Sequence, residues 1–191
     1  MEFSTQPCSV FDRKIYRLQH GLTLVELLVV IAVLGILLGM AAPSFDDMLL
    51  NHRQAAQVNQ LVGSLALARS EAVKRGQWVV MCKSQDGQQC TNQGHWDQGW
   101  IMFEDRNRNR QLDSDETLIH VFAGSEQIQL RYASFPSSNH VIYYPTGLSL
   151  GNGTFTFCDK RGAGSARAVI LAKSGRVRSS HMAANGGPLQ C

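Results

Sequence analysis

The feature that most constrains this chain is a long apolar segment close to its N-terminus. Residues 22–45 read LTLVELLVVIAVLGILLGMAAPSF and contain a single charged residue, Glu26. As a helix, this segment is long enough to cross about 30 Å of hydrocarbon. Basic residues lie just before it, at Arg13, Lys14 and Arg17, and no comparable cluster follows it. Because positive flanks stay in the cytoplasm, the sequence predicts one membrane span with the N-terminus inside and the body outside.

Glu26 is unusual in such a segment. An ionised carboxylate inside a membrane costs on the order of several kcal/mol and usually marks a functional contact with a partner. The alternative is a secretory signal that is cut after the small residues Gly39 and Ala41. Such signals have an uncharged apolar core of about 7–15 residues, so both the charge and the length of this segment favour a permanent helix.

The residues around Glu26 also form a motif. The hexapeptide GLTLVE at residues 21–26 resembles the prepilin peptidase site of type IV pilins. This resemblance implies that the prepilin peptidase cleaves between Gly21 and Leu22 and that the new amino group of Leu22 is methylated. It also implies that Glu26 pairs with the N-terminus of a neighbouring subunit during assembly. Leu22 stands where Phe is commoner, and a leader of 21 residues is long for the class.

The same resemblance divides the chain into three parts. Residues 1–21 are the expected leader, residues 22–45 a transmembrane and assembly helix, and residues 46–191 a periplasmic globular domain that includes the second half of the helix. Pro43 matches a position where these pilins commonly carry a proline, which kinks or loosens a helix. The alternative is that Pro43 ends the span. The implied location is the bacterial inner membrane, followed by assembly with other major and minor pilins into a surface pilus.

The body combines a helix with short strands. Apolar residues recur at helical spacing beyond Pro43, and Gly76 follows Lys74 and Arg75 as a stop signal, so the helix should continue to about residue 75. The apolar stripe consists of Val58, Leu61, Val62, Leu65, Ala68 and Ala72. The predicted strands span residues 78–83, 99–104, 117–122, 128–132, 140–144, 154–158 and 167–172. One long N-terminal helix packed on antiparallel β-sheet is an α+β layout, the type IV pilin fold.

The cysteines indicate disulfides. Cys8 precedes the predicted cut, so the mature chain keeps Cys82, Cys90, Cys158 and Cys191. An even set outside the cytoplasm indicates two disulfides, for which three pairings are possible. Pairing of Cys82 with Cys90 and of Cys158 with Cys191 is favoured because each pair closes a short or a terminal loop. The spacings fit no zinc pattern.

The body also resembles one branch of the pilin class, the group of GspH, FimT and FimU. The resemblance rests on the segment ARSEA at residues 68–72 and on the segment WDQGW at residues 96–100, which leads to Phe103 and Asp105. Pilus and secretion proteins share these segments. Within this branch the chain resembles the FimT kind most closely, because its C-terminal part is basic and contains a Gly-Arg-x-Arg segment.

The acidic segment at residues 105–116 is a candidate calcium loop. It has oxygen ligands at EF-hand positions one, three, five, nine and twelve, but position six is Arg110 where the loop needs Gly. Three arginines offset its acidic charge, which favours an internally ion-paired turn over a metal site. The six His are scattered and no nucleophile motif occurs, so we expect no enzyme, no metal and no cofactor.

The mature chain is electrically polarised. Residues 22–158 contain nine Lys or Arg and twelve Asp or Glu, a net charge of −3. Residues 159–191 contain six Lys or Arg and one Asp, a net charge of +5. The six basic residues are Lys160, Arg161, Arg167, Lys173, Arg176 and Arg178. The partner that the C-terminal part attracts is therefore expected to be acidic.

Gly175, Arg176 and Arg178 form a Gly-Arg-x-Arg segment. If Val177 packs inward, the alternation of a strand sends both arginines to the same outer face, where two guanidinium groups can bind successive phosphates. FimT-like pilins that bind DNA carry this motif, so the resemblance implies binding of double-stranded DNA for natural transformation, with the other four basic residues as supporting contacts. The alternatives are a solvated strand edge and a contact with another pilin.

Overall fold

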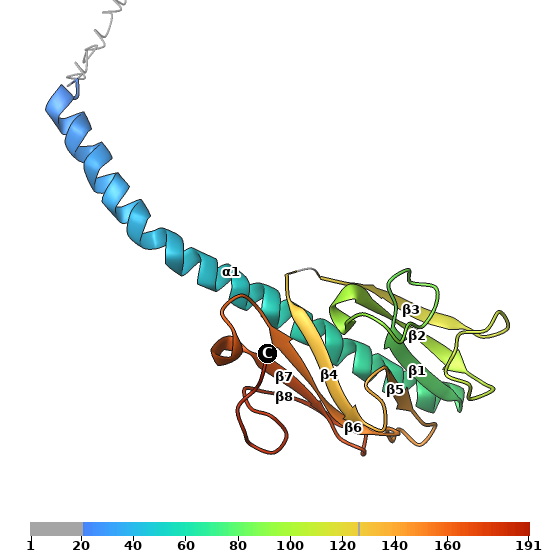
Figure 1. Ribbon diagram of the computed structural model, residues 1–191. Helices are drawn as coiled ribbons and strands as arrows, with labels where there is room; N and C mark the ends of the chain where they lie inside the picture. Colours follow the sequence, from blue (N-terminus) through green and yellow to red (C-terminus); the bar gives the residue numbers. More distant parts are fainter. Residues whose placement is uncertain (1–20, 126) are drawn as a thin grey trace, which may run out of the picture. The chain divides into compact units, whose positions relative to one another are not determined.

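The computed structural model describes residues 21–125 and 127–191 (Figure 1). The chain divides into two compact units, Met1–Ser44 and Phe45–Cys191, and the first is described from residue 21 onward. Residues 1–20 of the predicted leader, with Cys8 and the basic cluster that precedes the apolar segment, lie outside the described residues.

The N-terminal unit contains the start of helix α1 (Leu24–Arg75). The side-chain oxygen of Thr23 accepts a hydrogen bond of 3.2 Å from the backbone N–H of Glu26, so Thr23 caps the helix and Glu26 lies in its first turn. A carboxylate at this position interacts favourably with the helix dipole. Helix α1 continues past Pro43, so Pro43 does not end the helix.

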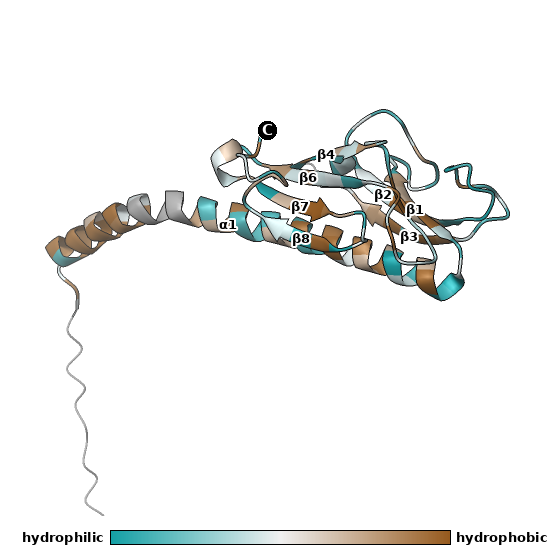
Figure 2. Cartoon of the chain, turned by 90° about the horizontal axis from the view of Figure 1, so that it is seen from below, coloured by the Kyte–Doolittle hydropathy of each residue, from teal (hydrophilic) through white to brown (hydrophobic). Residues whose placement is uncertain are grey.

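The side chains of this unit are exposed. All residues from 21 to 39 are exposed, and Figure 2 shows almost continuous hydrophobic colour along this part of α1. No helix in residues 21–125 and 127–191 is long and apolar enough to cross a membrane. The span predicted for residues 22–45 is therefore not confirmed.

The globular unit consists of the rest of α1 and two four-stranded antiparallel sheets, which lie against the helix (Figures 1 and 2). The first sheet has the order β3-β2-β1-β5, with β1 at Trp78–Lys83, β2 at Gly99–Asp105, β3 at Leu118–Ala123 and β5 at His140–Tyr143. The second sheet has the order β4-β6-β7-β8, with β4 at Gln129–Phe135, β6 at Asn152–Cys158, β7 at Arg167–Leu171 and β8 at Val177–Ser180. Single turns of 3-10 helix occur at Trp96–Gln98 and Ala163–Ser165.

One apolar core joins the helix to both sheets. Every predicted stripe residue on α1 is buried except Val62, which is half-buried at the margin of the core. The inner faces of the sheets supply the facing side chains, among them Met81, Met102, Phe155 and Val169. Trp96 lies between the sheets, with its ring centroid 6.4 Å from that of Trp100 and 5.2 Å from that of Phe155. Trp96 and Trp100 are both buried.

The α+β fold is confirmed, with one omission. All seven predicted strands are present, with ends that differ from the prediction by no more than three residues. Strand β8 is an eighth strand, which is absent from the predicted ranges although strand alternation about Val177 was considered. It is short, and its four residues are Val177, Arg178 and two serines, so its sequence lacks the apolar run that marks the other strands.

Two disulfides tie loops to the sheets. Cys82 is bonded to Cys90 and Cys158 to Cys191, which is the pairing that the sequence analysis favours. The second bond holds the C-terminal loop, residues 181–191, against the second sheet. Leu189 of this loop packs on Ala168 and Ile170, on the face of the sheet that points away from the main core.

Packing on α1 predicts a large difference between two neighbouring leucines. Leu65 is fully buried and Leu67 is 37% exposed. We expect Leu65→Ala to lower the free energy of unfolding by about 2–5 kcal/mol because it leaves a cavity against both sheets. The matched control Leu67→Ala should change it by less than about 0.5 kcal/mol. Urea unfolding followed by tryptophan fluorescence measures both, and equal losses would show that the stripe is not the core.

Candidate nucleic-acid interface

The Gly-Arg-x-Arg segment forms the turn between β7 and β8. The backbone N–H of Gly175 donates to the carbonyl of Ala172 at 2.9 Å, and that of Ala172 donates to the carbonyl of Arg176 at 3.0 Å. Gly175 has a φ of 75°, in the left-handed region that this type of hairpin turn requires. A Cβ atom at Gly175 would also collide with the carbonyl oxygen of Gly147. Glycine is therefore required here for two independent reasons.

A second turn packs against the first. Gly147, with a φ of 76°, closes the turn after Tyr144, and its N–H donates to the Tyr144 carbonyl at 2.8 Å. The two turns are joined directly, since the N–H of Ser149 donates to the carbonyl of Lys173 at 3.0 Å. The close approach of Gly147 and Gly175 thus connects the β7–β8 turn to the chain that follows β5.

Arg69 of α1 holds both turns. Its Nε donates to the carbonyl of Gly147 at 3.0 Å, and its Nη2 donates to the carbonyl of Ser174 at 3.3 Å. In the sequence, Arg69 stands out only as part of the segment ARSEA, which gives no indication of this role. Arg69 is far from Gly147 and Gly175 in the sequence, so its contact with the two glycine turns becomes evident only in the fold. Arg69 is a positioning residue that fixes the turn before Arg176.

The two predicted arginines lie on either side of Val177, with Arg178 in β8 and Arg176 immediately before it. Val177 packs against the main core, and Arg176 and Arg178 on either side of it are exposed. In the described part of the chain, no carboxylate lies within 4 Å of either guanidinium group. Strand β8 is also the edge of the second sheet. Both cations are therefore available to a phosphate backbone.

Of the other four predicted basic residues, not all lie beside Arg176 and Arg178. Lys173 is exposed in the same turn as Arg176, whereas Lys160 is exposed in the connection from β6 to β7, at the other end of the sheet. Arg167 is half-buried on β7, and its Nη1 lies 3.2 Å from Nε2 of His181. By alternation along β7, Arg167 faces α1 with the core residue Val169, so it lies on the opposite face from Arg178.

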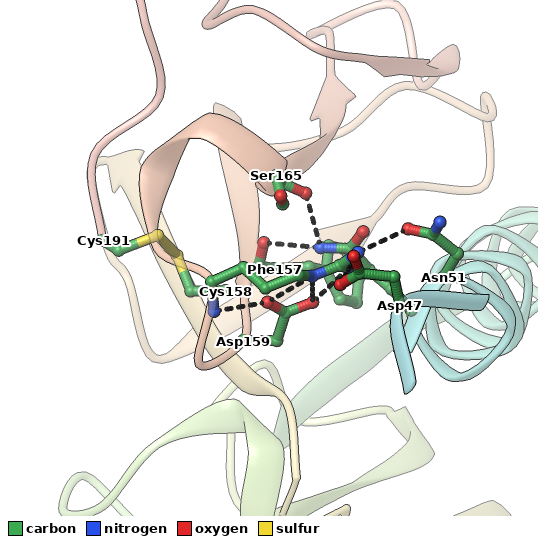
Figure 3. A network of polar contacts seen from close by, with 9 residues as sticks. Asp47, Asn51, Phe157, Cys158, Asp159, Ser165 and Cys191 are labelled. Carbon is green, nitrogen blue, oxygen red and sulfur yellow. Dashed lines mark hydrogen bonds and ion pairs between the residues drawn. A yellow bond between two sulfur atoms is a disulfide. The ribbon is translucent and has the colours of Figure 1, made fainter. Parts of the chain in front are cut away.

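Arg161 is held by carboxylates and an amide (Figure 3). Its Nη2 lies 2.6 Å from Oδ2 of Asp159, and its Nη1 lies 2.9 Å from Oδ1 of Asn51 and 3.7 Å from Oδ1 of Asp47, both on α1. The side chain of Asp159 is fully buried, and its hydrogen bonds with Arg161 hold its pKa below the usual range. Beside this pair, the amide of Gln54 donates to the carbonyls of Phe157 and Ser165. Arg161 therefore joins α1 to the end of β6 and is not a free cation.

The candidate calcium loop is closed by its own hydrogen bonds. Both oxygens of Asp105 accept backbone N–H groups, from Asn109 at 3.1 Å and Arg110 at 3.2 Å. Asn107 and Asn109 each donate to Oδ2 of Asp113 at 2.7 Å. No group of three or more His, Cys, Asp or Glu among the described residues is placed to hold a metal ion. The loop is thus closed by hydrogen bonds from amide groups, and the salt-bridge contacts of the described residues include none between two members of residues 105–116, so the predicted internal ion pairing is not seen.

Two family profiles match the chain. The prokaryotic N-terminal methylation motif matches residues 16–42, and the family of the type II transport protein GspH matches residues 57–175. The chain belongs to the GspH family. The GspH match ends at Gly175, so Arg176, Arg178 and the C-terminal loop of this GspH-family protein lie beyond the matched region.

Individual relatives agree with this assignment. The pilin-like protein PilA1 of Thermus thermophilus is 32% identical over 164 residues, which cover 84% of this chain and 97% of PilA1. The fimbrial protein EcpB of Eikenella corrodens is 38% identical over 72 residues, which cover 36% of this chain and 43% of EcpB. The crystal structure of the type IV minor pilin FimU of Pseudomonas aeruginosa covers 68% of this chain and 90% of FimU with a TM-score of 0.51. At 18% identity, FimU shows that the fold is shared.

The role of Arg69 in this GspH-family fold can be measured at the turn. Arg69→Ala removes two hydrogen bonds to the turns, so we expect the amide protons of Ser149 and Gly175 to exchange faster with deuterium. Arg53→Ala is the control, because Arg53 is also exposed on α1 and makes no ion pair among the described residues. Unchanged exchange at both amides in Arg69→Ala would refute the role.

The buried pair of Asp159 and Arg161 predicts a dependence of stability on pH. Because the pKa of Asp159 is lowered in the folded state, its contribution is complete above its unfolded pKa of about 4 and is lost as pH falls through the folded pKa. The wild type should therefore lose stability more steeply below about pH 4 than Asp159→Asn. Thermal unfolding at several pH values tests this, with the exposed Asp115→Asn as control. If wild type and Asp159→Asn lose stability equally as the pH falls below about 4, the prediction is wrong.

Proposed function

We propose that this GspH-family protein is a FimT-like minor type IV pilin that binds extracellular DNA for uptake in natural transformation. The observation that carries the proposal is the pair Arg176 and Arg178, both exposed at the start of the edge strand β8. Two guanidinium groups on alternate positions of a strand can each contact a phosphate without reading the bases. The net charge of +5 in residues 159–191 attracts the backbone over a longer range.

The geometry narrows the set of supporting contacts. Lys173 shares the turn with Arg176 and is exposed, so it belongs to the proposed site. Arg161 is occupied by Asp159, and Arg167 faces the other side of the sheet. Lys160 is exposed but lies at the opposite end of β7, and it contributes to the general field of the domain. The proposed site therefore consists of Gly175 for the turn and of Lys173, Arg176 and Arg178 for phosphate.

The N-terminal unit supplies the assembly part of the proposal. The methylation motif covers the junction of Gly21 and Leu22, for which we propose cleavage by the prepilin peptidase and methylation of Leu22. The exposed apolar side chains of residues 22–38 need a non-aqueous environment, which we propose is the inner membrane before assembly and neighbouring pilins afterwards. Glu26, exposed in the first turn of α1, would then pair with the amino group of a neighbouring subunit.

A purely structural role is the second candidate. The fold shared with the minor pilin FimU and the match to the GspH family both suit a subunit that primes pilus assembly or belongs to a type II secretion machine. In that role the arginines of β8 would contact another subunit. DNA binding by the isolated protein separates this role from the first proposal, because a structural subunit needs no affinity for a phosphate backbone.

A gel shift tests the proposed function. We expect the full chain, kept in solution by a mild non-ionic detergent, to retard duplex DNA of any sequence at low salt. The variant Arg176→Ala with Arg178→Ala should bind at least tenfold more weakly, and the slope of log affinity against log salt should fall by about 2, because two phosphate contacts are lost.

The control for charge is Arg53→Ala with Lys74→Ala. It removes the same net charge from exposed positions on α1, so it should change the affinity by less than about threefold. Failure of the wild type to retard duplex DNA would refute the proposal, as would equal binding by the β8 variant.

A further inference from the structure

The face of the second sheet that points away from the main core forms a surface next to Arg176 and Arg178. Along β4, Leu130 and Tyr132 are buried in the core, so Arg131, Ala133 and Phe135 point to the other side. The register pairs Ala133 with Thr154, Thr154 with Ile170, and Ile170 with Arg178. Residues paired in this way across a sheet have side chains on the same face, so one row runs from β4 to Arg178. We call this side of the sheet the outer face.

Phe135 is the most exposed aromatic side chain of the described residues. It is 77% exposed, and it follows Ala133 at the outer-face position that pairs with Asn152. Phe135 is at one edge of the sheet and Arg178 is at the other. Three strand spacings separate the edges, a distance of roughly 14 Å. This distance corresponds to about four nucleotides at a stacked rise of about 3.4 Å.

The surface between these edges is uncharged, and the C-terminal loop covers part of it, because Leu189 packs on Ala168 and Ile170 of β7. Asn152 and Ala172, which lie beside Phe135 and Arg176 at the end of the sheet, are exposed. Strand β6 supplies Asn152, Thr154 and Thr156 to this surface, and no Asp or Glu lies at any outer-face position of the four strands. A groove runs between β4, β6 and the C-terminal loop, with Ala133 and the two threonines on its floor. Arg131 fixes the wall, because its Nη1 donates to the backbone oxygen of Cys191 at 2.8 Å. The disulfide to Cys158 holds the same end of the loop.

We propose that this outer face binds single-stranded DNA, with the backbone on Arg176 and Arg178 and a base stacked on Phe135. The inference rests on the proposed function and extends it from phosphate contact to the kind of strand that is bound. Cations at one edge and an exposed aromatic ring at the other are the two components of a binding surface for single strands. In a duplex the bases are already paired and stacked, so a duplex contacts only the arginines.

The choice of single-stranded DNA over a protein partner follows from the charge of the face. A phosphate backbone complements two arginines without a carboxylate between them, and bases can accept hydrogen bonds from Thr154, Thr156 and Asn152. An apolar protein surface would leave these polar groups without partners. The face has one large apolar side chain, Phe135, that is exposed, which suits one stacked base better than a hydrophobic interface.

Fluorescence anisotropy with a labelled 12-nucleotide single strand and the matching duplex tests the inference. We expect Phe135→Ala to weaken binding of the single strand at least fivefold and to leave duplex binding within twofold. Phe135→Tyr keeps the ring and should retain wild-type affinity for the single strand. Leu148→Ala is the control for loss of an exposed apolar side chain, because Leu148 is 49% exposed and lies outside the sheet. Circular dichroism establishes that each variant is folded.

The outcomes separate this inference from the proposed function. If Arg176→Ala with Arg178→Ala loses duplex binding while Phe135→Ala binds the single strand as tightly as wild type, the arginine site stands and the outer-face inference is overturned. The inference is also overturned if Phe135→Leu binds the single strand as tightly as Phe135→Tyr. A large apolar side chain would then be enough for binding, without an aromatic ring. If the arginine variant binds both DNAs as wild type does, both proposals fail.

Discussion

The burial of one stripe of α1 is the constraint on which the globular unit depends. Leu61, Leu65, Ala68 and Ala72 have no exposed surface, and the inner faces of both sheets meet on them. Small residues at positions 68 and 72 let the strands approach the helix closely, while the larger leucines fill the space between the sheets. The sheets also meet directly at Trp96, which packs on Tyr132 and Phe155, so the helix and this aromatic contact together set their positions.

The polar contacts of α1 extend this constraint to the surface. Arg69 follows a buried alanine by one residue, and its guanidinium reaches the carbonyls of two neighbouring turns. Toward the other end of the same unit, Asn51 and Asp47 hold Arg161 and thereby the end of β6. The helix thus fixes both ends of the second sheet. This explains why the turn before β8 has a defined conformation although it is exposed.

The sequence analysis and the structure agree where local patterns are strong. Residues that are close together in the sequence determine the apolar period of residues 58–72, the stop at Gly76 and the alternation in the strands. The α+β fold and the seven strands could therefore be predicted. The conditional inference that Arg176 and Arg178 share a face follows from alternation about Val177, which does pack inward. The role of Arg161 could not be predicted, because its partners Asn51 and Asp47 are 110 and 114 residues away in the sequence. The role of Arg167 could not be predicted, because it depends on which face of β7 packs on α1.

By itself the sequence determined the processing motif, the family, the helix and most of the strands, since each of these depends on residues that are close along the chain. The tertiary structure alone decided which of the six C-terminal cations are free. It also placed Phe135 on the outer face that carries Arg178, although 43 positions separate them in the sequence. The physical reason is that the pairing of four strands brings distant residues into one row. The periodicity within a single segment does not indicate which strands pair or in which register.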